Sequence, residues 1–419
     1  MIVGIDIGTS YSSICVLKND GHAEPVYVST GVSIYGNEFS LPSAVFVNDN
    51  GNILVGQAAC NSRIKKPENF KSEFKRDFGQ DKPYQIANRQ FLPHDLYREI
   101  FRHFRSCIAK SEQIEKAWIT HPASYNTIRK QLLVKAANGA GFINVELIDE
   151  PTAASRSFLV ENSSLIKEGQ IILLYDFGGG TFDVALLKNK MGELVPIVNP
   201  KGVERCGGSD IDRIIFADIL NEVPAAFLYK LKENPLLLKR FNSKLMTSAI
   251  KVKHQLTMTE ECNEDIETDF DFFTYSLDRQ RFNGLISAVI DETISCVQSI
   301  LTSANLNIGN IDHTILVGGS SRIPLVKTRL EQVGLCQVNS SMNAELAIAA
   351  GAAYMGIVKE EETSMEVSDD IFESEDDVDI DDITIDCKIA EEVKQPQLVV
   401  IPQYQNEPTK QIFNPDLFN

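Results

Sequence analysis

Apolar positions recur with two different periods along the chain up to about residue 358, and together they predict a mixed α/β fold. Short apolar runs such as Ser13–Leu17 and Thr314–Val317 fit strands, because a strand that is covered on both faces reads as a continuous apolar run. The stretch Phe282–Ala304 instead spaces leucine, isoleucine and valine three or four positions apart, as one face of a helix requires. By the same reasoning we predict further helices at Leu96–Ala109, Arg129–Ala140, Thr152–Val160, from Pro324, and at Ala344–Met355, with strands at Lys116–Thr120 and Glu146–Ile148 and a hairpin pair at Glu260–Leu277.

A polar loop at Glu161–Gly169 separates two halves in which hairpin strands are followed by helices, and we place a lobe boundary there. The chain after about Lys359 changes character, because it becomes acidic and loses its apolar periodicity. We therefore expect a first lobe made of residues 1–168 together with 344–358, a second lobe made of residues 169–343, and a disordered tail made of residues 359–419.

The charge of the chain is concentrated in this tail. Between Glu360 and Asp386 there are 14 acidic residues and no lysine or arginine, so the net charge of −18 falls to −4 when that segment is set aside. The tail is either a solvated segment or a docking segment for a basic partner. The remainder lacks the basic excess that nucleic-acid binding requires, so we expect no nucleic-acid partner.

The cysteine pattern and the hydropathy of the chain indicate the cellular compartment of the protein. The eight cysteines are scattered and contain no CxxC pair, which is typical of reduced thiols in a cytosolic protein. The N-terminus has no basic region ahead of an apolar core, and the longest apolar stretch, Leu346–Val358, is too short to cross a bilayer. We expect a cytoplasmic protein without a membrane segment, and a monomer.

A glycine-and-aspartate pattern occurs twice, about 170 residues apart, at Val3–Tyr11 and at Leu173–Thr181. Each copy reads as a β-hairpin whose tight glycine turn exposes backbone N–H groups to an anion, with Asp6 or Asp176 placed to hold Mg²⁺ through water. Two such turns that face one another would hold the phosphates of a nucleotide from both sides. The alternative, two ordinary glycine hairpins with surface acids, accounts for the composition but not for the shared order of residues.

A third glycine turn, Gly318-Gly319, follows a predicted buried strand and precedes a predicted helix. A double glycine there lets a flat ligand pack on the backbone, although a plain turn between strand and helix explains it equally well on its own. Beside Asp6 and Asp176 it completes a candidate nucleotide site. The sequence contains no GxxxxGK[ST] motif, no GxGxxG motif after a strand, and no HExxH motif.

The motifs and their order closely resemble the ATPase domain of the seventy-kilodalton heat-shock chaperones, the DnaK-like family. The resemblance covers about 85% of the chain, from Met1 to Val358, and implies an α/β, two-lobed actin-like ATPase fold in which each lobe has a ribonuclease-H-like core. It also implies that ATP or ADP binds with Mg²⁺ in the cleft between the lobes. The motifs that carry the resemblance are GIDIGTSYS, VGQAA, FKR, ITHPASYN, IDEPTAA, YDFGGGTFDVALL, GGSDID and ILVGGSSRIP.

The resemblance implies roles for individual residues. Asp6 and Asp176 would hold Mg²⁺ through water, Lys75 would position the attacking water, and Glu150 would sense Mg²⁺ and water. Thr181 would contact the γ-phosphate. Without the resemblance, Lys75 reads as a solvated lysine and Glu150 as an acid at a helix N-terminus. The remaining implied contacts to the nucleotide are Gly8, Thr9, Ser10, Tyr11, Gly178, Gly179, Gly180, Gly207, Gly208, Lys253, Thr257, Gly318, Gly319, Ser320, Arg322 and Glu345, and Pro122 matches a proline that relays nucleotide state.

The chain departs from the family pattern in several places. Ile250 stands where many members have a glutamate that faces the ribose, and His254 where some have an arginine against adenine, so we expect weaker nucleotide affinity. The segment Gly79–Phe91 is shorter than in long members, and Arg129 or Lys130 replaces a coupling arginine. We identify no peptide-binding domain and no leucine-rich linker.

The leading hypothesis is a chaperone-like protein that hydrolyses ATP slowly with Mg²⁺ and passes lobe closure to a protein partner, such as a co-chaperone, an exchange factor or a client. A second hypothesis is a nucleotide-binding scaffold or co-chaperone decoy with little hydrolysis. A third is a small-molecule kinase of the same fold, which needs a sugar-binding acid that we do not identify.

Overall fold

The structure is a computed structural model that describes residues 1–31, 38–109, 112–162, 166–232, 234–267, 272–335, 338–340 and 345–357. These residues belong to one compact unit, Met1–Glu360. The predicted tail, residues 359–419, lies outside the described residues. So do residue 344, where the last predicted helix begins, and residue 358.

Two mixed sheets have the same strand order and the same strand directions. In the first, β1 pairs antiparallel with β2 and parallel with β10, giving the order β11-β10-β1-β2-β3, and β4 also pairs with β2. In the second, β12 pairs antiparallel with β13 and parallel with β18, giving the order β14-β13-β12-β18-β19, and β15 also pairs with β13. The strands are β1 (Ile2–Ile7), β2 (Tyr11–Leu17), β3 (Ala23–Pro25), β4 (Ser40–Pro42), β10 (Lys116–His121), β11 (Val145–Asp149), β12 (Ile171–Phe177), β13 (Thr181–Lys190), β14 (Glu193–Pro196), β15 (Lys201–Glu204), β18 (His313–Val317) and β19 (Val338–Ser340).

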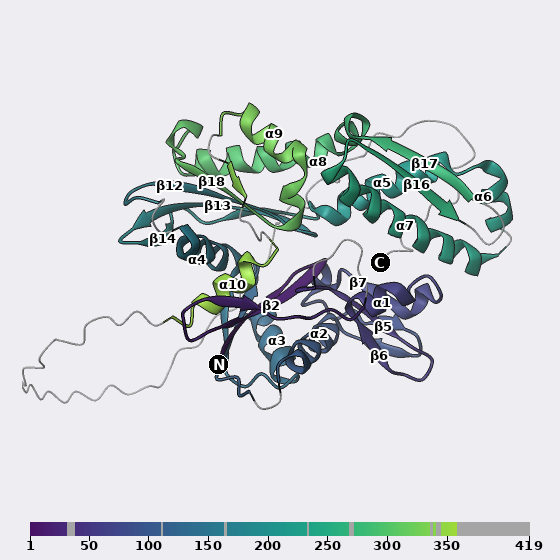
Figure 1. Cartoon of the computed structure of the whole chain (residues 1–419), viewed down its shortest axis with the longest axis horizontal. Coiled ribbons are helices and arrows are strands. Elements are labelled where there is room, and N and C mark those ends of the chain that lie inside the picture. The colour runs from purple at the N-terminus through teal and green to yellow at the C-terminus, as the bar shows by residue number, and fades with distance from the viewer. Residues whose placement is uncertain are drawn as a thin grey trace, which may run out of the picture. The chain divides into compact units, whose positions relative to one another are not determined.

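Helices cover these sheets, and α4 and α10 lie between them (Figure 1). One apolar core joins Ile148 of β11 to side chains of α4, β12, β18 and α10, so the two sheets share buried contacts. The helices are α1 (Gly56–Ser62), α2 (Pro93–Cys107), α3 (Thr127–Asn138), α4 (Glu150–Asn162), α5 (Gly208–Glu222), α6 (Ala225–Lys232), α7 (Pro235–Met258), α8 (Arg279–Ser303), α9 (Pro324–Gln332) and α10 (Ala347–Tyr354), with 3-10 turns η1 (Pro67–Asn69), η2 (Phe74–Asp77), η3 (Ile308–Asn310) and η4 (Gly319–Arg322).

Three small sheets complete the described elements. The segment that is shorter than in long family members contains a two-stranded hairpin, and the predicted acidic and aromatic hairpin is present as β16 and β17. Their strands are β5 (Ala44–Val47), β6 (Ile53–Val55), β7 (Phe70–Ser72), β8 (Tyr84–Ile86), β9 (Arg89–Phe91), β16 (Glu261–Glu267) and β17 (Phe272–Asp278).

Several helices begin earlier in the chain than the apolar positions predicted, because a polar side chain caps the helix ahead of them. Helix α8 begins at Arg279 because the Asp278 carboxylate accepts a hydrogen bond from the Arg281 N–H group. Helix α3 begins after Asn126, whose side chain accepts from the Arg129 N–H group. The apolar period identified these helices correctly, and the polar caps set where they begin.

Two glycines allow α10 to pack closely against its neighbours. A Cβ atom on Gly351 would lie 1.7 Å from the carbonyl oxygen of Ala153 in α4, and one on Gly4 would lie 2.2 Å from the carbonyl oxygen of Ala349. Any side chain at either glycine would therefore push α10 away. This packing brings the last described helix against β1 and α4.

Helix α8 is the one helix in the described ranges that is long and apolar enough to cross a membrane. That test rests on length and composition only, and core helices of globular proteins also pass it. The apolar stripe of α8, which includes Phe282, Ile286 and Ile290, is buried inside the protein. The helix therefore behaves as a core element of the second sheet. The six cysteines that the structure describes are free thiols.

Candidate functional site

Asp6 and Asp176 occupy matching positions in the two sheets. Asp6 lies near the end of β1 and Asp176 near the end of β12, each one pair before its hairpin turn. Both carboxylates are buried, and Asp6 accepts a hydrogen bond from the Thr120 hydroxyl of β10 at 2.8 Å. The duplicated sequence pattern thus corresponds to a duplicated local structure.

The glycine turns of the two sheets contact one another. A Cβ atom on Gly180 would lie 2.4 Å from the Thr9 hydroxyl oxygen, and one on Gly179 would lie 2.1 Å from the Ser10 hydroxyl oxygen. The turn before α5 joins them, because a Cβ atom on Gly207 would lie 2.7 Å from the backbone of Gly179. The two predicted phosphate turns and the turn at Gly207 therefore meet at one place, where a Cβ atom on any of these three glycines would clash.

Lys75 and Glu150 form a buried ion pair beside these turns. Lys75 is on η2 and Glu150 is the first residue of α4, and Lys75 Nζ lies 2.6 Å from Glu150 Oε1. Their side chains are 10% and 6% exposed, so the reading of Lys75 as a solvated lysine is wrong. Burial acts to lower the pKa of Lys75, but the carboxylates of Glu150 and Asp6 outweigh it and hold that pKa above its usual value.

The aspartates around Lys75 have raised pKa values. Burial raises the pKa of Asp6 to about 6, and Lys75 opposes this shift. Burial, together with the Glu150 carboxylate, also raises the pKa of Asp176 and lifts that of Asp183 to about 7. These pKa values are well above the ordinary aspartate pKa. The folded protein therefore keeps buried carboxylates close together at an energetic cost.

Sequence reasoning missed Asp183. It lies directly opposite Asp176 in the pairing of β12 with β13. Asp183 raises the pKa of Asp176, and Glu150 raises the pKa of both aspartates. Like charges on facing strands destabilise a hairpin, so their pairing points to a functional site. The signal was available, because counting back from the glycine turn places the two aspartates at the same level.

The residues present fit a hydrated magnesium ion. Four carboxylates, those of Asp6, Glu150, Asp176 and Asp183, lie within electrostatic reach of the Lys75 ammonium group, so the buried acids outnumber this cation. Across the described part of the chain, no group of three or more His, Cys, Asp or Glu side chains could hold a metal directly. Mg²⁺ keeps much of its water shell when it binds to proteins. These carboxylates would therefore hold the ion through its water molecules.

The predicted nucleoside wall lies against the same turns. Gly318 has a φ of 80°, and a Cβ atom there would lie 2.7 Å from the Asp176 carboxylate. The Ser320 hydroxyl donates to the Gly178 carbonyl at 2.8 Å, and the Lys253 ammonium group donates to the Gly208 carbonyl at 3.1 Å. These contacts join η4 and α7 to the phosphate turns.

The other residues predicted on this wall are less directly tied to the turns. Arg322 forms an ion pair with Glu345 at 3.3 Å. The Thr257 hydroxyl donates to the carbonyl of Lys253 within its own helix, so this contact does not link it to the phosphate turns. Burial lowers the pKa of His254 to about 4, helped by the charges of Lys253 and Arg322, so this side chain is neutral near pH 7.

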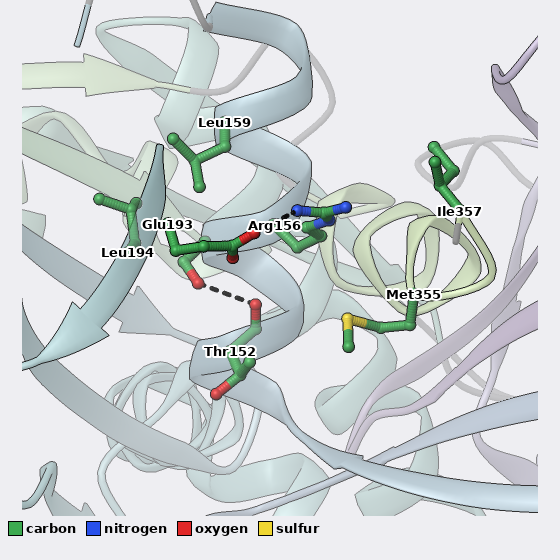
Figure 2. Close-up of a pocket in the computed structure, with 8 residues that line it drawn as sticks. Thr152, Arg156, Leu159, Glu193, Leu194, Met355 and Ile357 are labelled. Carbon is green, nitrogen blue, oxygen red and sulfur yellow. Dashed lines mark hydrogen bonds and ion pairs between the residues drawn. The ribbon is translucent and has the colours of Figure 1, made fainter. Parts of the chain in front are cut away.

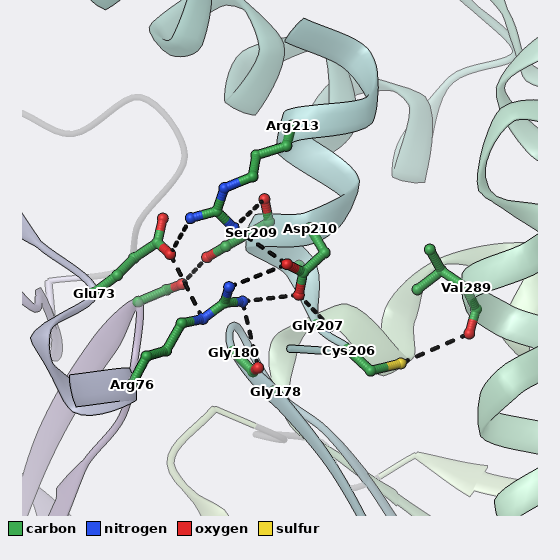
Figure 3. A network of polar contacts seen from close by, with 12 residues as sticks. Glu73, Arg76, Gly178, Gly180, Cys206, Gly207, Ser209, Asp210, Arg213 and Val289 are labelled. Carbon is green, nitrogen blue, oxygen red and sulfur yellow. Dashed lines mark hydrogen bonds and ion pairs between the residues drawn. The ribbon is translucent and has the colours of Figure 1, made fainter. Parts of the chain in front are cut away.

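Four charged residues connect η2 to α5 beside the site (Figure 3). The Arg76 guanidinium group donates to both carboxylate oxygens of Asp210, at 3.0 Å and 2.8 Å, and the Arg213 guanidinium group donates to Glu73 at 2.6 Å. Glu73 and Arg76 flank Lys75 in the chain, whereas Asp210 and Arg213 are on the first turns of α5. The sequence motifs contained Arg76 and Asp210 but gave no reason to pair them.

A separate hollow is lined by α4, β14 and the chain after α10 (Figure 2). Arg156 and Glu193 form an ion pair of 3.3 Å at its edge, and Leu159, Leu194 and Met355 supply apolar atoms. None of the residues predicted for the nucleotide site lines this hollow.

The raised pKa of Asp6 predicts a pH dependence of stability. The protonated carboxyl group favours the folded state, so this contribution is fully present below the ordinary aspartate pKa and is lost as pH rises through about 6. Asp6→Asn keeps an oxygen for Thr120 without the charge. We expect this variant to gain up to about 3 kcal/mol of unfolding free energy over the metal-free wild type between pH 4 and pH 7.5.

Thermal and denaturant unfolding across this pH range measure the gain. Asp20→Asn, which changes an exposed turn aspartate, is the matched control and should track the wild type at every pH. Parallel curves for Asp6→Asn and the wild type would contradict the expected shift.

Comparison with known proteins agrees with the motifs. The family model described as Hsp70 protein matches residues 2–383. The chain is 30% identical over 368 residues to a chaperone protein DnaK of Thermotoga neapolitana, covering 85% of this chain and 59% of that protein. It is 29% identical over 373 residues to a chaperone protein DnaK of Nitrosopumilus maritimus, covering 87% of this chain and 57% of that protein.

The chain thus spans less than three fifths of the length of these relatives. The family match, together with the two sheets of like topology, confirms the two-lobed actin-like α/β fold. Because the matched model covers most of the chain, the chain belongs to the Hsp70 protein family.

Proposed function

We propose that this protein binds ATP with Mg²⁺ and hydrolyses it slowly to ADP. The observation that carries the proposal is the buried Lys75–Glu150 ion pair, which lies among three aspartates where the glycine turns meet. Hydrolysis of a γ-phosphate needs neutralised charge and a positioned water more than covalent chemistry. This set of groups is suited to both tasks.

The residues of the chain would divide the work. Asp6, Asp176 and Asp183 would hold the hydrated magnesium ion, which when bound neutralises charge on the phosphates. Backbone N–H groups of the glycine turns would bind phosphate oxygens. Lys75 would leave Glu150 and orient the attacking water, and the Thr181 hydroxyl would contact the γ-phosphate.

The balance between open and closed lobes would then depend on which nucleotide is bound. Contacts across the two sheets, made by the glycine turns and by the network of Figure 3, favour a closed arrangement. In this proposal ATP and ADP shift the balance between open and closed lobes, and a protein partner of a chaperone system responds to the difference. We further infer that the protein acts as a monomer in the cytoplasm, where its free thiols stay reduced.

A single-turnover assay with excess protein and radiolabelled ATP tests the proposal. We expect conversion to ADP with Mg²⁺ and none when EDTA removes the metal. Tight ADP binding without conversion would instead favour the nucleotide-binding scaffold, for which His254 and Ile250 on the nucleoside wall are the supporting observation. Acceleration by a sugar would favour a small-molecule kinase.

A further inference from the structure

Two buried tyrosine hydroxyls near Lys75 have no part in the chemistry described above. Tyr97 is on α2 and Tyr125 is in the loop between β10 and α3, and they are 1% and 9% exposed. Both hydroxyl oxygens are buried and lie within interaction distance of one another, but neither makes a hydrogen bond of good geometry among the residues that the structure describes. A buried hydroxyl without a partner costs free energy that phenylalanine would avoid, so two of them side by side need an explanation.

Aromatic packing fixes both rings relative to Lys75. Phe78 lies against both, with ring centroids 4.6 Å from Tyr97 and 5.6 Å from Tyr125. Phe74 meets Tyr97 edge to face at 5.3 Å. Phe74 immediately precedes Lys75 and Phe78 follows the same 3-10 turn, so the two tyrosine rings pack against the segment of backbone that carries Lys75.

The ion pair lies within electrostatic reach of the tyrosines. Burial raises the pKa of Tyr125 to about 12, an effect that Lys75 opposes and Glu150 reinforces. Burial likewise raises the pKa of Tyr97, with Tyr125 and Glu150 adding to the rise. Both side chains therefore stay neutral near pH 7, so each hydroxyl can donate a hydrogen bond but does not act as a base.

The function proposed for Lys75 leaves Glu150 without its cation. In the structure the two side chains neutralise one another at 2.6 Å, and Lys75 must release Glu150 before it can orient a water on the phosphate. A buried carboxylate that loses its only cation becomes costly unless a new donor replaces it.

We propose that Tyr125, supported by Tyr97, is a positioning residue whose hydroxyl donates to the Glu150 carboxylate when Lys75 turns to the phosphate. The inference rests on the proposed hydrolysis. The hydroxyl holds the Glu150 carboxylate in place, and it lowers the free-energy difference between the paired and the released states of Lys75. In the paired state that the structure shows, the Tyr125 hydroxyl makes no hydrogen bond of good geometry.

Tyr125→Phe tests the inference, because it removes the hydroxyl and keeps the packed ring. We expect kcat for ATP hydrolysis to fall about tenfold, since hydrogen bonds to charged groups are the strong ones, while KM and the affinity for ADP stay unchanged. The melting temperature should stay level or rise, because a hydroxyl without a partner is lost. Tyr97→Phe should have a smaller effect, and the double variant should fall no further than Tyr125→Phe.

Tyr275→Phe is the matched control. Its hydroxyl is also buried but donates to Asp218 at 2.5 Å, far from the glycine turns in sequence and on a separate hairpin. We expect this variant to lose thermal stability and to keep the wild-type kcat. The opposite responses of Tyr125→Phe and Tyr275→Phe distinguish positioning from a structural role.

The outcomes separate this inference from the proposed function. Wild-type turnover together with an unchanged kcat in Tyr125→Phe overturns the inference alone. A wild type without Mg²⁺-dependent turnover overturns both. A fall in kcat that parallels a fall in melting temperature also overturns the inference, because the hydroxyl would then be structural.

Discussion

Replacing Lys75 with methionine is expected to reduce single-turnover ATP hydrolysis by at least two orders of magnitude. Methionine keeps most of the length and apolar surface of lysine but carries no charge, so the attacking water and the phosphate lose their positioned cation. Binding of ADP with Mg²⁺ should change only a few-fold, because the glycine turns supply the phosphate contacts from the backbone. Filter binding and quenched-flow measurements separate the two effects.

The same substitution should destabilise the protein without nucleotide. Removing one partner of a buried ion pair leaves Glu150 and three aspartates without their cation, which typically costs about 3 to 5 kcal/mol. Lys75→Met with Glu150→Gln removes both charges, so this double variant should recover stability but not turnover. That pattern separates a loss of chemistry from a loss of folding.

Lys71→Met provides the matched control, since Lys71 lies on β7, just ahead of the 3-10 turn that carries Lys75. Its ammonium group rests over the Tyr84 ring, 4.2 Å from the centroid, and takes no part in the ion pair. This variant should retain wild-type turnover. Equal losses in Lys71→Met and Lys75→Met, or full activity in Lys75→Met, would contradict the role proposed for Lys75.

Much of the fold could be predicted because it depends on local patterns. The apolar period located α8, and the shared order of residues around Asp6 and Asp176 identified two equivalent hairpins. Helix starts were less predictable, because they depend on single polar caps such as Asp278. The place of α10 depends on Gly4 and Gly351, whose missing side chains matter only once α10, β1 and α4 are packed together.

The candidate site was predictable only where a motif marked it. Motif order brought Lys75 and Glu150 into one hypothesis, and their ion pair fits that hypothesis although the roles themselves stay predictions. Asp183 was overlooked because the register of β12 with β13, which places it opposite Asp176, was not counted back from the glycine turn. Tyr97 and Tyr125 could not be found from sequence, since tyrosines at helical or loop positions read as ordinary core until their hydroxyls are seen without partners.

The network between the sheets is also a tertiary feature, because Arg76 and Asp210 are 134 positions apart. It links η2, which carries Lys75, to α5, which begins at the glycine turn. Glu73 adds strain, since its backbone has a φ of 57°, which a non-glycine residue adopts at a cost. Lobe closure would thus be coupled to the position of Lys75.

We therefore expect Arg76→Gln to speed ADP release about tenfold, which corresponds to ~1.4 kcal/mol. The Arg76–Asp210 ion pair is bidentate, and its side chains are 10% and 20% exposed, so solvent and salt screen it less than a surface ion pair. Its loss should therefore shift the lobes toward the open form. Asp210→Asn should act similarly while its side-chain oxygen still caps α5 through the Gly207 N–H group.

A double-mutant cycle with stopped-flow release of a fluorescent ADP decides whether the two residues act as a unit. Arg76→Gln with Asp210→Asn should release ADP no faster than either single variant, because each change already breaks the same contact. The control pair, Lys18→Gln and Glu24→Gln, removes an ion pair of 2.8 Å that lies within the first sheet and should leave release unchanged. Additive effects of the Arg76 and Asp210 changes would show that the pair does not hold the lobes together, whereas a non-additive cycle would identify it as the contact that opens before the nucleotide leaves.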